Sequence, residues 1–139
     1  VNIPAENLGA NRMLQLDLGR VQVIAEVRLN GKDLGILWKA PFRVDVTSAA
    51  KAGDNELEVR ITNLWPNRMI GDEQYPEDCE WNGITLKRWP DWMVKGEPRP
   101  VPQRITFTTW KHWHKDSPLQ SSGLIGPVVF RTLEQMPVK

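Results

Sequence analysis

The sequence has little cysteine, little net charge and no long apolar run, and each shortage excludes a class of protein. A single cysteine, Cys79, excludes a disulfide within the chain. A formal net charge of +1 gives no electrostatic basis for binding nucleic acid. The apolar runs are too short to span a membrane. We therefore expect neither nucleic acid nor a membrane as a partner.

The N-terminus carries neither an initiating methionine nor a signal-peptide pattern. We expect a mature or excised piece of a larger protein whose domain begins upstream, with Val1–Ile3 as the remnant of a strand. An unpaired sheet edge there would pair with the parent protein or with a second copy, which predicts an edge-strand homodimer. The length of 139 residues, 40% of them hydrophobic, fits one domain, residues 1–139, with a packed core.

Apolar and polar residues alternate with a period of two along most of the chain, which predicts half-buried β-strands. The predicted strands are Met13–Leu18, Val21–Leu29, Lys32–Leu37, Phe42–Val46, Leu57–Ile61, Ile105–Thr109 and Val128–Thr132. Asn30-Gly31 predicts a tight hairpin, because a type I′ turn needs positive φ at both positions. Thr47 is expected to cap a single helical turn at Ser48–Ala52. Helical periodicity never extends over three turns, so the fold class is all-β, an antiparallel sandwich or barrel.

The stretch from Leu64 to Gln103 departs from this pattern, because it is rich in proline and tryptophan. Loops of this length in compact domains are functional or disordered, and disordered segments lack aromatics. We expect an ordered loop excursion at about 64–103, pinned by its own tryptophans. Pro90 is expected to start a short helical turn ending near Val94.

Carboxylates crowd this excursion: Asp72, Glu73, Glu77, Asp78 and Glu80. A glycosidase needs two carboxyl groups about 5–10 Å apart across a sugar, and nothing in the sequence fixes that spacing. We expect a solvated acidic loop, with one member bound to Arg68, and no catalytic residue. Irregular acidic loops also suit calcium, so a structural calcium ion stays open.

His112 and His114 flank Trp113, and their spacing would place both on one strand face, as a zinc site requires. No third ligand lies nearby in the sequence, so no metal ligand and no cofactor are expected. Cys79 lies among carboxylates, which should raise the pKa of its thiol and make it a poor nucleophile.

Tryptophan beside arginine, asparagine and aspartate is a combination that binds sugars, because aromatic faces contact apolar C–H groups while polar groups bind hydroxyls. The candidate carbohydrate-binding residues are Trp65, Asn67, Arg68, Asp72, Trp110 and Trp113. Trp65 also continues the alternation of Leu57, Val59 and Ile61. It is therefore expected to be a buried anchor of the excursion rather than a sugar platform.

Several motifs together resemble a known family. Asn30-Gly31-Lys32, Leu34-Gly35, Pro41-Phe42, Asp45-Val46-Thr47 and the alternating Gly53, Asn55, Leu57 and Val59 resemble the sugar-binding domain of the β-galactosidase/β-glucuronidase family. Leu37-Trp38-Lys39, Asn63–Glu73, Phe107–Trp110 and Ser122–Val128 look like the C-terminal domain of large bacterial α-L-rhamnosidases. The resemblance covers roughly Leu14 to Phe130.

The resemblance implies a galactose-binding-like β-sandwich of the jelly-roll type. Its role would be that of a non-catalytic, carbohydrate-binding accessory module of a periplasmic or secreted bacterial glycoside hydrolase. The catalytic carboxylates of such enzymes lie in a separate barrel domain. Two alternatives are a purely structural domain, whose aromatics pack on the parent catalytic domain, and an independent enzyme, which would turn over an aryl-rhamnoside.

Overall fold

A computed structural model describes residues 1–134 and divides the chain into two compact units. The first, here called the sandwich unit, comprises Val1–Leu64 and the segment from Ser121 onward. The second, here called the insert unit, is Trp65–Gln120. The insert unit starts where the excursion was expected but continues well beyond Gln103. That the two units form a single domain stays a prediction.

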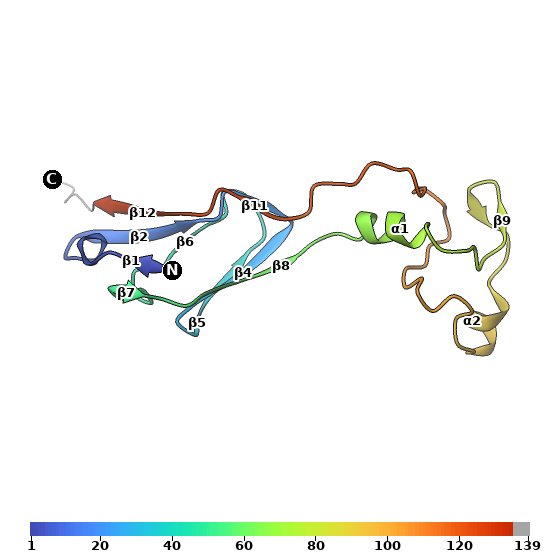
Figure 1. Ribbon diagram of the computed structural model, residues 1–139, viewed down its shortest axis with the longest axis horizontal. Helices are drawn as coiled ribbons and strands as arrows, with labels where there is room; N and C mark the ends of the chain where they lie inside the picture. The colour runs from blue at the N-terminus through green and yellow to red at the C-terminus, as the bar shows by residue number, and fades with distance from the viewer. Residues whose placement is uncertain (135–139) are drawn as a thin grey trace. The chain divides into compact units, whose positions relative to one another are not determined.

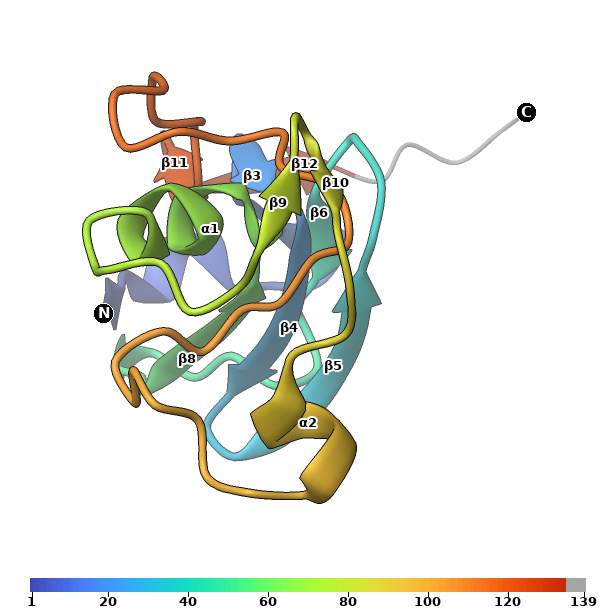
Figure 2. The same cartoon turned by 90° about the vertical axis from the view of Figure 1, so that its right-hand side faces the viewer.

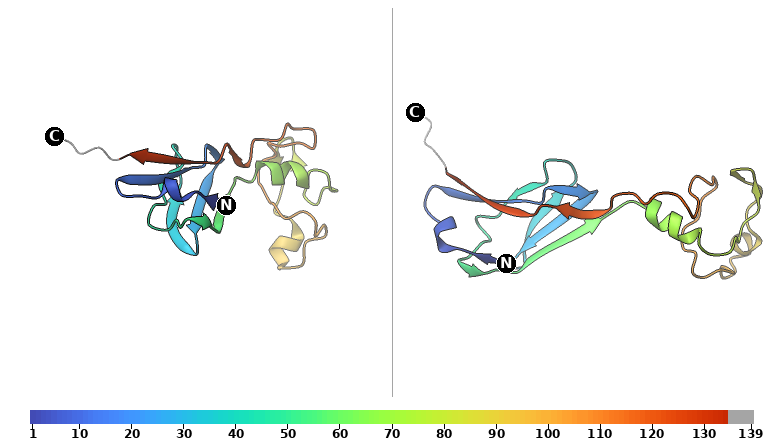
Figure 3. Two further views of the ribbon diagram at one scale, coloured as in Figure 1. Left: turned by 60° about the vertical axis from the view of Figure 1, so that its left-hand side comes forward. Right: turned by 45° about the horizontal axis from the view of Figure 1, so that its top comes forward.

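The sandwich unit is built from short antiparallel strands (Figure 1). They are β1 (Asn2–Ile3), β2 (Arg12–Asp17), β3 (Arg20–Gln22), β4 (Ile24–Leu29), β5 (Lys32–Leu37), β6 (Arg43–Asp45), β7 (Gly53–Asp54), β8 (Leu57–Thr62), β11 (Gly123–Gly126) and β12 (Val129–Glu134), with a 3-10 turn η1 (Ala5–Asn7). Two three-stranded sheets have the orders β12-β2-β6 and β5-β4-β8, and β1-β7 and β11-β3 form further pairs. The first and last long strands, β2 and β12, lie side by side (Figure 3).

The alternating pattern fixes which face of each strand is buried. Ala25, Val27 and Leu29 of β4 are fully buried, and Glu26 and Arg28 between them are not. The core is a single cluster to which both three-stranded sheets contribute: Ile3, Leu14, Leu16, Leu18, Val21, Ala25, Val27, Leu29, Phe42 and Val46. The fold class is therefore the predicted all-β antiparallel sandwich.

The predicted hairpin is confirmed, because β4 and β5 are joined at Asn30 and Gly31, whose φ angles are 52° and 76°. Asn30 also binds the two residues that connect β7 to β8. Its side-chain nitrogen donates to Asn55 Oδ1 at 2.7 Å, and its side-chain oxygen accepts from the Glu56 amide at 3.0 Å. These bonds give Asn30 and Asn55 a structural role in the motifs that carry the family resemblance.

Two local predictions for the sandwich unit are wrong. The pattern from Val21 to Leu29 is two strands, because β3 pairs with β11 whereas β4 pairs with β5 and β8. Thr47 begins a turn and no helix follows it. Its hydroxyl instead accepts a hydrogen bond from the Leu14 amide at 2.8 Å and donates to Asp45. Val1–Ile3 behaves partly as expected, because Asn2–Ile3 forms β1 and pairs with β7. The edge-strand homodimer stays a prediction.

The insert unit contains two short helices, α1 (Pro66–Asp72) and α2 (Asp91–Lys95), and a small hairpin of β9 (Trp81–Asn82) and β10 (Thr85–Leu86) (Figure 2). Pro66 is at the first helical position of α1, where its missing N–H costs nothing. The predicted turn after Pro90 is confirmed as α2, which ends at Gly96 with a φ of 68°. No helix within residues 1–134 is long and apolar enough to cross a membrane.

Candidate functional site

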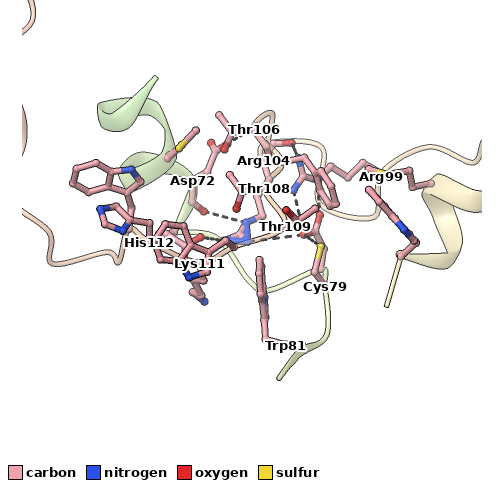
Figure 4. A pocket seen from close by; sticks show the side chains of 18 residues that line it. Asp72, Cys79, Trp81, Arg99, Arg104, Thr106, Thr108, Thr109, Lys111 and His112 are labelled. Atoms are coloured by element: carbon pink, nitrogen blue, oxygen red, sulfur yellow. Dashed lines mark hydrogen bonds and ion pairs between the residues drawn. The ribbon is translucent and has the colours of Figure 1, made fainter. Parts of the chain in front are cut away.

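The insert unit contains an open cavity of about 700 Å³ (Figure 4). Its lining combines aromatic, sulfur-containing, charged and hydroxyl side chains: Met69, Asp72, Glu73, Asp78, Cys79, Trp81, Trp89, Met93, Arg99, Arg104, Thr106, Phe107, Thr108, Thr109, Trp110, Lys111, His112 and Trp113. These residues come from α1, from the segments around the β9–β10 hairpin and α2, and from the stretch that follows α2. The cavity is therefore formed within the insert unit.

The β9–β10 hairpin carries Trp81 into this lining. Asn82 pairs with Thr85, and Gly83 and Ile84 form the turn between them, with Gly83 at a φ of 61°. The hairpin is joined to the last lining segment, because the Leu86 amide donates to Thr109 O at 2.9 Å and the Lys111 amide donates to Ile84 O at 2.7 Å. The alternating pattern did not indicate this hairpin, whose two-residue loop has glycine at its first position, a signal for a type II′ turn that differs from the Asn30-Gly31 turn.

Asp72 is a buried carboxylate that organises one wall of the cavity. Its Oδ2 accepts hydrogen bonds from the Ile105 amide at 2.9 Å and from the amide and the hydroxyl of Thr106, both at 2.7 Å. Burial raises the pKa of Asp72, but these hydrogen bonds outweigh burial and hold the pKa below its usual value. The prediction of a strand at Ile105–Thr109 is wrong. The amides of Ile105 and Thr106 donate to the Asp72 carboxylate instead of to a neighbouring strand.

Two arginines surround this carboxylate. Arg68 Nη2 lies 2.8 Å from Asp72 Oδ1, which is ion-pair distance, although no donor is aligned for a hydrogen bond to that oxygen. This is the predicted pairing of Arg68 with one of the carboxylates. Arg104 is 5% exposed, and it donates to the Asp72 carbonyl at 3.1 Å and to Glu73 Oε1 at 2.7 Å. These contacts join α1 to the segment around Arg104.

A second buried pair joins Asp78 to Arg99. Arg99 Nε and Nη2 donate to the two oxygens of Asp78, whose side chain is 1% exposed. Burial raises the pKa of Asp78, but the Arg99 guanidinium outweighs it and lowers the pKa overall. The remaining arginine nitrogen, Nη1, donates to the carbonyls of Arg104 and Thr106, both at 2.8 Å.

Lys111 completes the charged part of the lining. Its ammonium lies 3.1 Å from Glu73 Oε2 and donates a hydrogen bond to Glu77. It also lies over the Trp81 ring, 5.6 Å from the centroid, and the indole Nε1 of Trp81 donates to Glu77 at 2.8 Å. Figure 4 shows Lys111, Arg104 and Trp81 around the same space.

The prediction of a solvated acidic loop is confirmed for Glu77 and Glu80, which are exposed, and is wrong for Asp72, Glu73 and Asp78, which are buried or half-buried. Glu73, Glu77 and Asp78 each pair with a cation of the insert unit, and Glu80 pairs with Arg88 and Lys87. The hydrogen-bonding cations of Glu73, Glu77 and Asp78 lie 21 to 34 residues away, so the sequence around these carboxylates did not reveal them.

Aromatic side chains make up a further part of the lining. The His112 ring lies between two tryptophans, with centroid distances of 5.1 Å to Trp110 and 4.9 Å to Trp113. Trp89 stacks on Phe107 with centroids 5.8 Å apart. Among the residues that the structure describes, no group of three histidine, cysteine or carboxylate side chains converges to hold a metal ion.

The structure brings together only part of the predicted site. Asp72, Trp110 and Trp113 line the cavity, whereas Trp65, Asn67 and Arg68 do not. Asn67 instead binds the backbone of Gln120, donating to its carbonyl at 2.8 Å and accepting from its amide at 2.7 Å.

The prediction that Trp65 is a buried anchor is wrong, because the residue is 56% exposed. The core alternation of β8 ends at Ile61, and Asn63 and Trp65 are both exposed. Trp65 is the residue that precedes α1, and its carbonyl accepts a hydrogen bond from the Met69 amide at 2.9 Å.

The predicted inertness of Cys79 has a physical basis in the structure. Burial raises the pKa of its thiol, and the adjacent Asp78 carboxylate raises it further, to about 11. Because a thiol must ionise to act as a nucleophile, Cys79 is protonated at neutral pH and poorly reactive.

Fold and sequence comparisons agree on the class of this chain. It belongs to the family described as glycosyl hydrolase 2 galactose-binding domain-like, whose profile matches residues 1–113. The chain is thus a galactose-binding-like domain of the glycoside hydrolase type.

Particular relatives are much longer proteins. A protein of Formosa agariphila named "Putative beta-glucuronidase" is 57% identical over 126 residues, which is 91% of this chain and 11% of that protein. A second protein of that name and organism is 29% identical over 91 residues. The solved rhamnosidase from Novosphingobium sp. PP1Y superposes with a TM-score of 0.70 at 36% identity, over 96% of this chain and 10% of that one. The chain therefore spans about a tenth of the length of these relatives.

Proposed function

We propose that this chain is a non-catalytic accessory domain of a larger glycoside hydrolase, and that it binds carbohydrate in the cavity of the insert unit. The observation that supports this is the lining itself, in which Trp81, Trp89, Trp110 and Trp113 share one cavity of about 700 Å³ with hydroxyl and charged groups. Aromatic faces contact the apolar C–H faces of sugars, and polar groups fix the orientation of their hydroxyls.

The carboxylates of this cavity support a non-catalytic role. A glycosidase keeps one carboxyl group protonated as a general acid, which requires a raised pKa. Hydrogen bonds and ion pairs lower the pKa of Asp72 and Asp78, which line the cavity, and of Glu77, which lies outside the lining and binds Lys111, despite burial, which acts in the opposite direction. These groups are ionised at neutral pH and held by cations, so they serve to stabilise the insert unit.

Tryptophan substitutions test sugar binding. Trp110→Ala and Trp113→Ala should each weaken binding of a neutral oligosaccharide by roughly tenfold, because a contact with one aromatic face contributes about 1 kcal/mol or slightly more. Their melting temperatures should change little, because Trp110 is 52% exposed and Trp113 is only partly buried. Binding is measured by intrinsic fluorescence titration and by a glycan array.

The matched control is Trp38→Ala. Trp38 is 66% exposed, belongs to the sandwich unit and is not part of the cavity lining. Its loss should leave sugar binding unchanged. Equal losses in all three variants would contradict a site in the insert unit.

A second candidate function is packing on the catalytic part of the parent enzyme. The observation that favours it is a set of large apolar side chains that are strongly exposed in a chain spanning 11% of its relative: Ile36, Trp38, Leu64, Trp65, Val94 and Leu119. Deuterium exchange of the isolated chain and of the full-length parent would separate the two functions. Protection of these segments in the parent, together with no binding on a glycan array, would favour packing alone.

From the same family relationship we propose that the parent enzyme is periplasmic or secreted in a bacterium. Its glycan substrate would then be extracellular. Fractionation of cells that express the full-length parent tests this. Recovery of the protein only in the cytoplasmic fraction would contradict it.

A further inference from the structure

We infer that the cavity of the insert unit takes an electrically neutral carbohydrate in preference to a uronic acid or a sulfated sugar; this rests on the sugar binding proposed above. Acidic sugars are recognised by arginine or lysine side chains that donate charge-assisted hydrogen bonds to the anionic group. The cavity can recognise an acidic sugar in this way only if a cation of its lining has N–H donors left for the ligand.

The two arginines of the lining are already engaged. Arg99 uses one edge of its guanidinium for both oxygens of Asp78 and its Nη1 for two backbone carbonyls. Arg104 is 5% exposed and donates to Glu73 and to the Asp72 carbonyl. All three nitrogens of Arg99 therefore donate within the protein, and Arg104 is buried with its Nη1 3.6 Å from Glu77 Oε2 and 3.9 Å from Asp78 Oδ1.

Lys111 is engaged in the same way. Its ammonium contacts Glu73 at 3.1 Å and donates to Glu77, and the Trp81 ring covers another side. A sugar carboxylate would have to displace one of these protein carboxylates, which are tethered and therefore present at a higher effective concentration.

The charges of the whole cluster cancel. The cations are Arg68, Arg99, Arg104 and Lys111, and the carboxylates paired with them are Asp72, Glu73, Glu77 and Asp78, four of each sign. An additional anion in this cavity would lose hydration, gain no unpaired cation and approach the existing carboxylates. A neutral sugar avoids these costs and still gains the contacts with the aromatic faces.

Matched sugar pairs test the inference. The chain is titrated with methyl β-glucoside and methyl β-glucuronide, and with methyl β-galactoside and methyl β-galacturonide, at pH ~8, where an ordinary histidine is neutral. Wherever a pair binds, the neutral glycoside should bind about tenfold more tightly than its matching uronide, a difference of ~1.4 kcal/mol in binding free energy. Its affinity should not change with ionic strength, because no charge pairing is involved.

A variant that removes one carboxylate from a cation of the lining should abolish this preference. Glu77→Gln keeps an amide oxygen for Trp81 Nε1 but removes one of the two carboxylates on Lys111. The affinity for the glucuronide relative to the glucoside should rise roughly tenfold. Glu80→Gln is the control, because Glu80 pairs with Lys87 and Arg88 at exposed positions and not with a cation of the cavity lining.

The outcomes separate this inference from the proposed function. Tighter binding of the uronides by the unaltered chain, with affinity that falls as salt is added, would overturn the inference and leave sugar binding intact. Binding of none of the four glycosides would overturn both. An unchanged preference in folded Glu77→Gln protein would also contradict the inference, because Lys111 would then play no part in selecting against anions.

Discussion

Asp17 is a buried carboxylate of the sandwich unit that pairs with two arginines. It is 5% exposed, its Oδ2 lies 2.8 Å from Arg43 Nε and 3.1 Å from Arg131 Nε, and its Oδ1 accepts from the Gly19 amide at 2.9 Å. The Gly19 hydrogen bond and then the two arginines lower the pKa of Asp17, against burial, which raises it. The carboxylate thus joins β2 to both of its neighbours, β6 and β12.

Asp17→Asn should reduce the free energy of unfolding at neutral pH by roughly 1.5–3 kcal/mol, the range for hydrogen bonds to a charged group. Because the folded-state pKa is lowered, the ionic contribution is present above the unfolded pKa of about 4 and is lost as pH falls through the folded value. The difference between the two proteins should therefore shrink on acidification. Urea titrations at several pH values measure this; a difference that does not change with pH would contradict it.

At the scale of the element, the pairing of β3 with β11 depends on a close backbone approach. A Cβ placed on Gly19 would lie 2.5 Å from the Gly126 carbonyl carbon, and the φ of Gly19 is 64°. Gly31 has a similar φ of 76°, but a Cβ there would meet nothing within 4 Å. Substitutions at the two glycines therefore distinguish the energetic cost of the backbone conformation, which both positions share, from the cost of a steric clash, which only Gly19 has.

Gly31→Ala should cost about 1–2 kcal/mol, the cost of the left-handed conformation for a residue with a side chain. Gly19→Ala should cost more, because the strands must also move apart. Thermal denaturation of both variants measures the difference. Equal costs would show that the approach of Gly19 to Gly126 contributes nothing.

The helix α1 and the segment around Arg104 are held together by polar contacts rather than by a large apolar core. Arg104→Ala should destabilise the insert unit by about 3 kcal/mol, because it leaves buried acceptors without their partner. Hydrogen exchange should increase within 65–120 while β4 stays protected. Arg88→Ala is the control, because its ion pairs with Glu80 and Asp91 are exposed and exchange should not change. Uniform loss of protection along the chain would contradict a separately stabilised unit.

At the scale of the whole molecule, the family and the share of the relatives covered predict an accessory role. The chain alone should release no product from aryl α-L-rhamnosides or aryl β-glucuronides, because each carboxylate of its cavity is paired with a cation. Release is followed by absorbance of the liberated phenol. Turnover that survives repurification and disappears in Asp72→Asn or Glu73→Gln protein would show that the chain is itself an enzyme.

The sequence by itself determined the strands β2, β4, β5 and β8, the Asn30-Gly31 hairpin and the helical turn after Pro90. These features depend on side-chain alternation and on φ preferences, which act between residues that are close in the chain. A glycine at the first position of the Gly83-Ile84 loop is a related local signal for the hairpin that carries Trp81. The resemblance in the motifs also indicated the family.

Only the tertiary structure decided which tryptophans share a cavity and which carboxylates form ion pairs with which cations. Asp78 binds Arg99, which is 21 residues away, and Glu77 binds Lys111, which is 34 residues away. The path of the chain between such partners sets their distance, and alternation carries no information about it. The same path leaves Trp65 exposed although its phase in the sequence matches the core, and it gives the amides of Ile105 and Thr106 to a carboxylate instead of a strand.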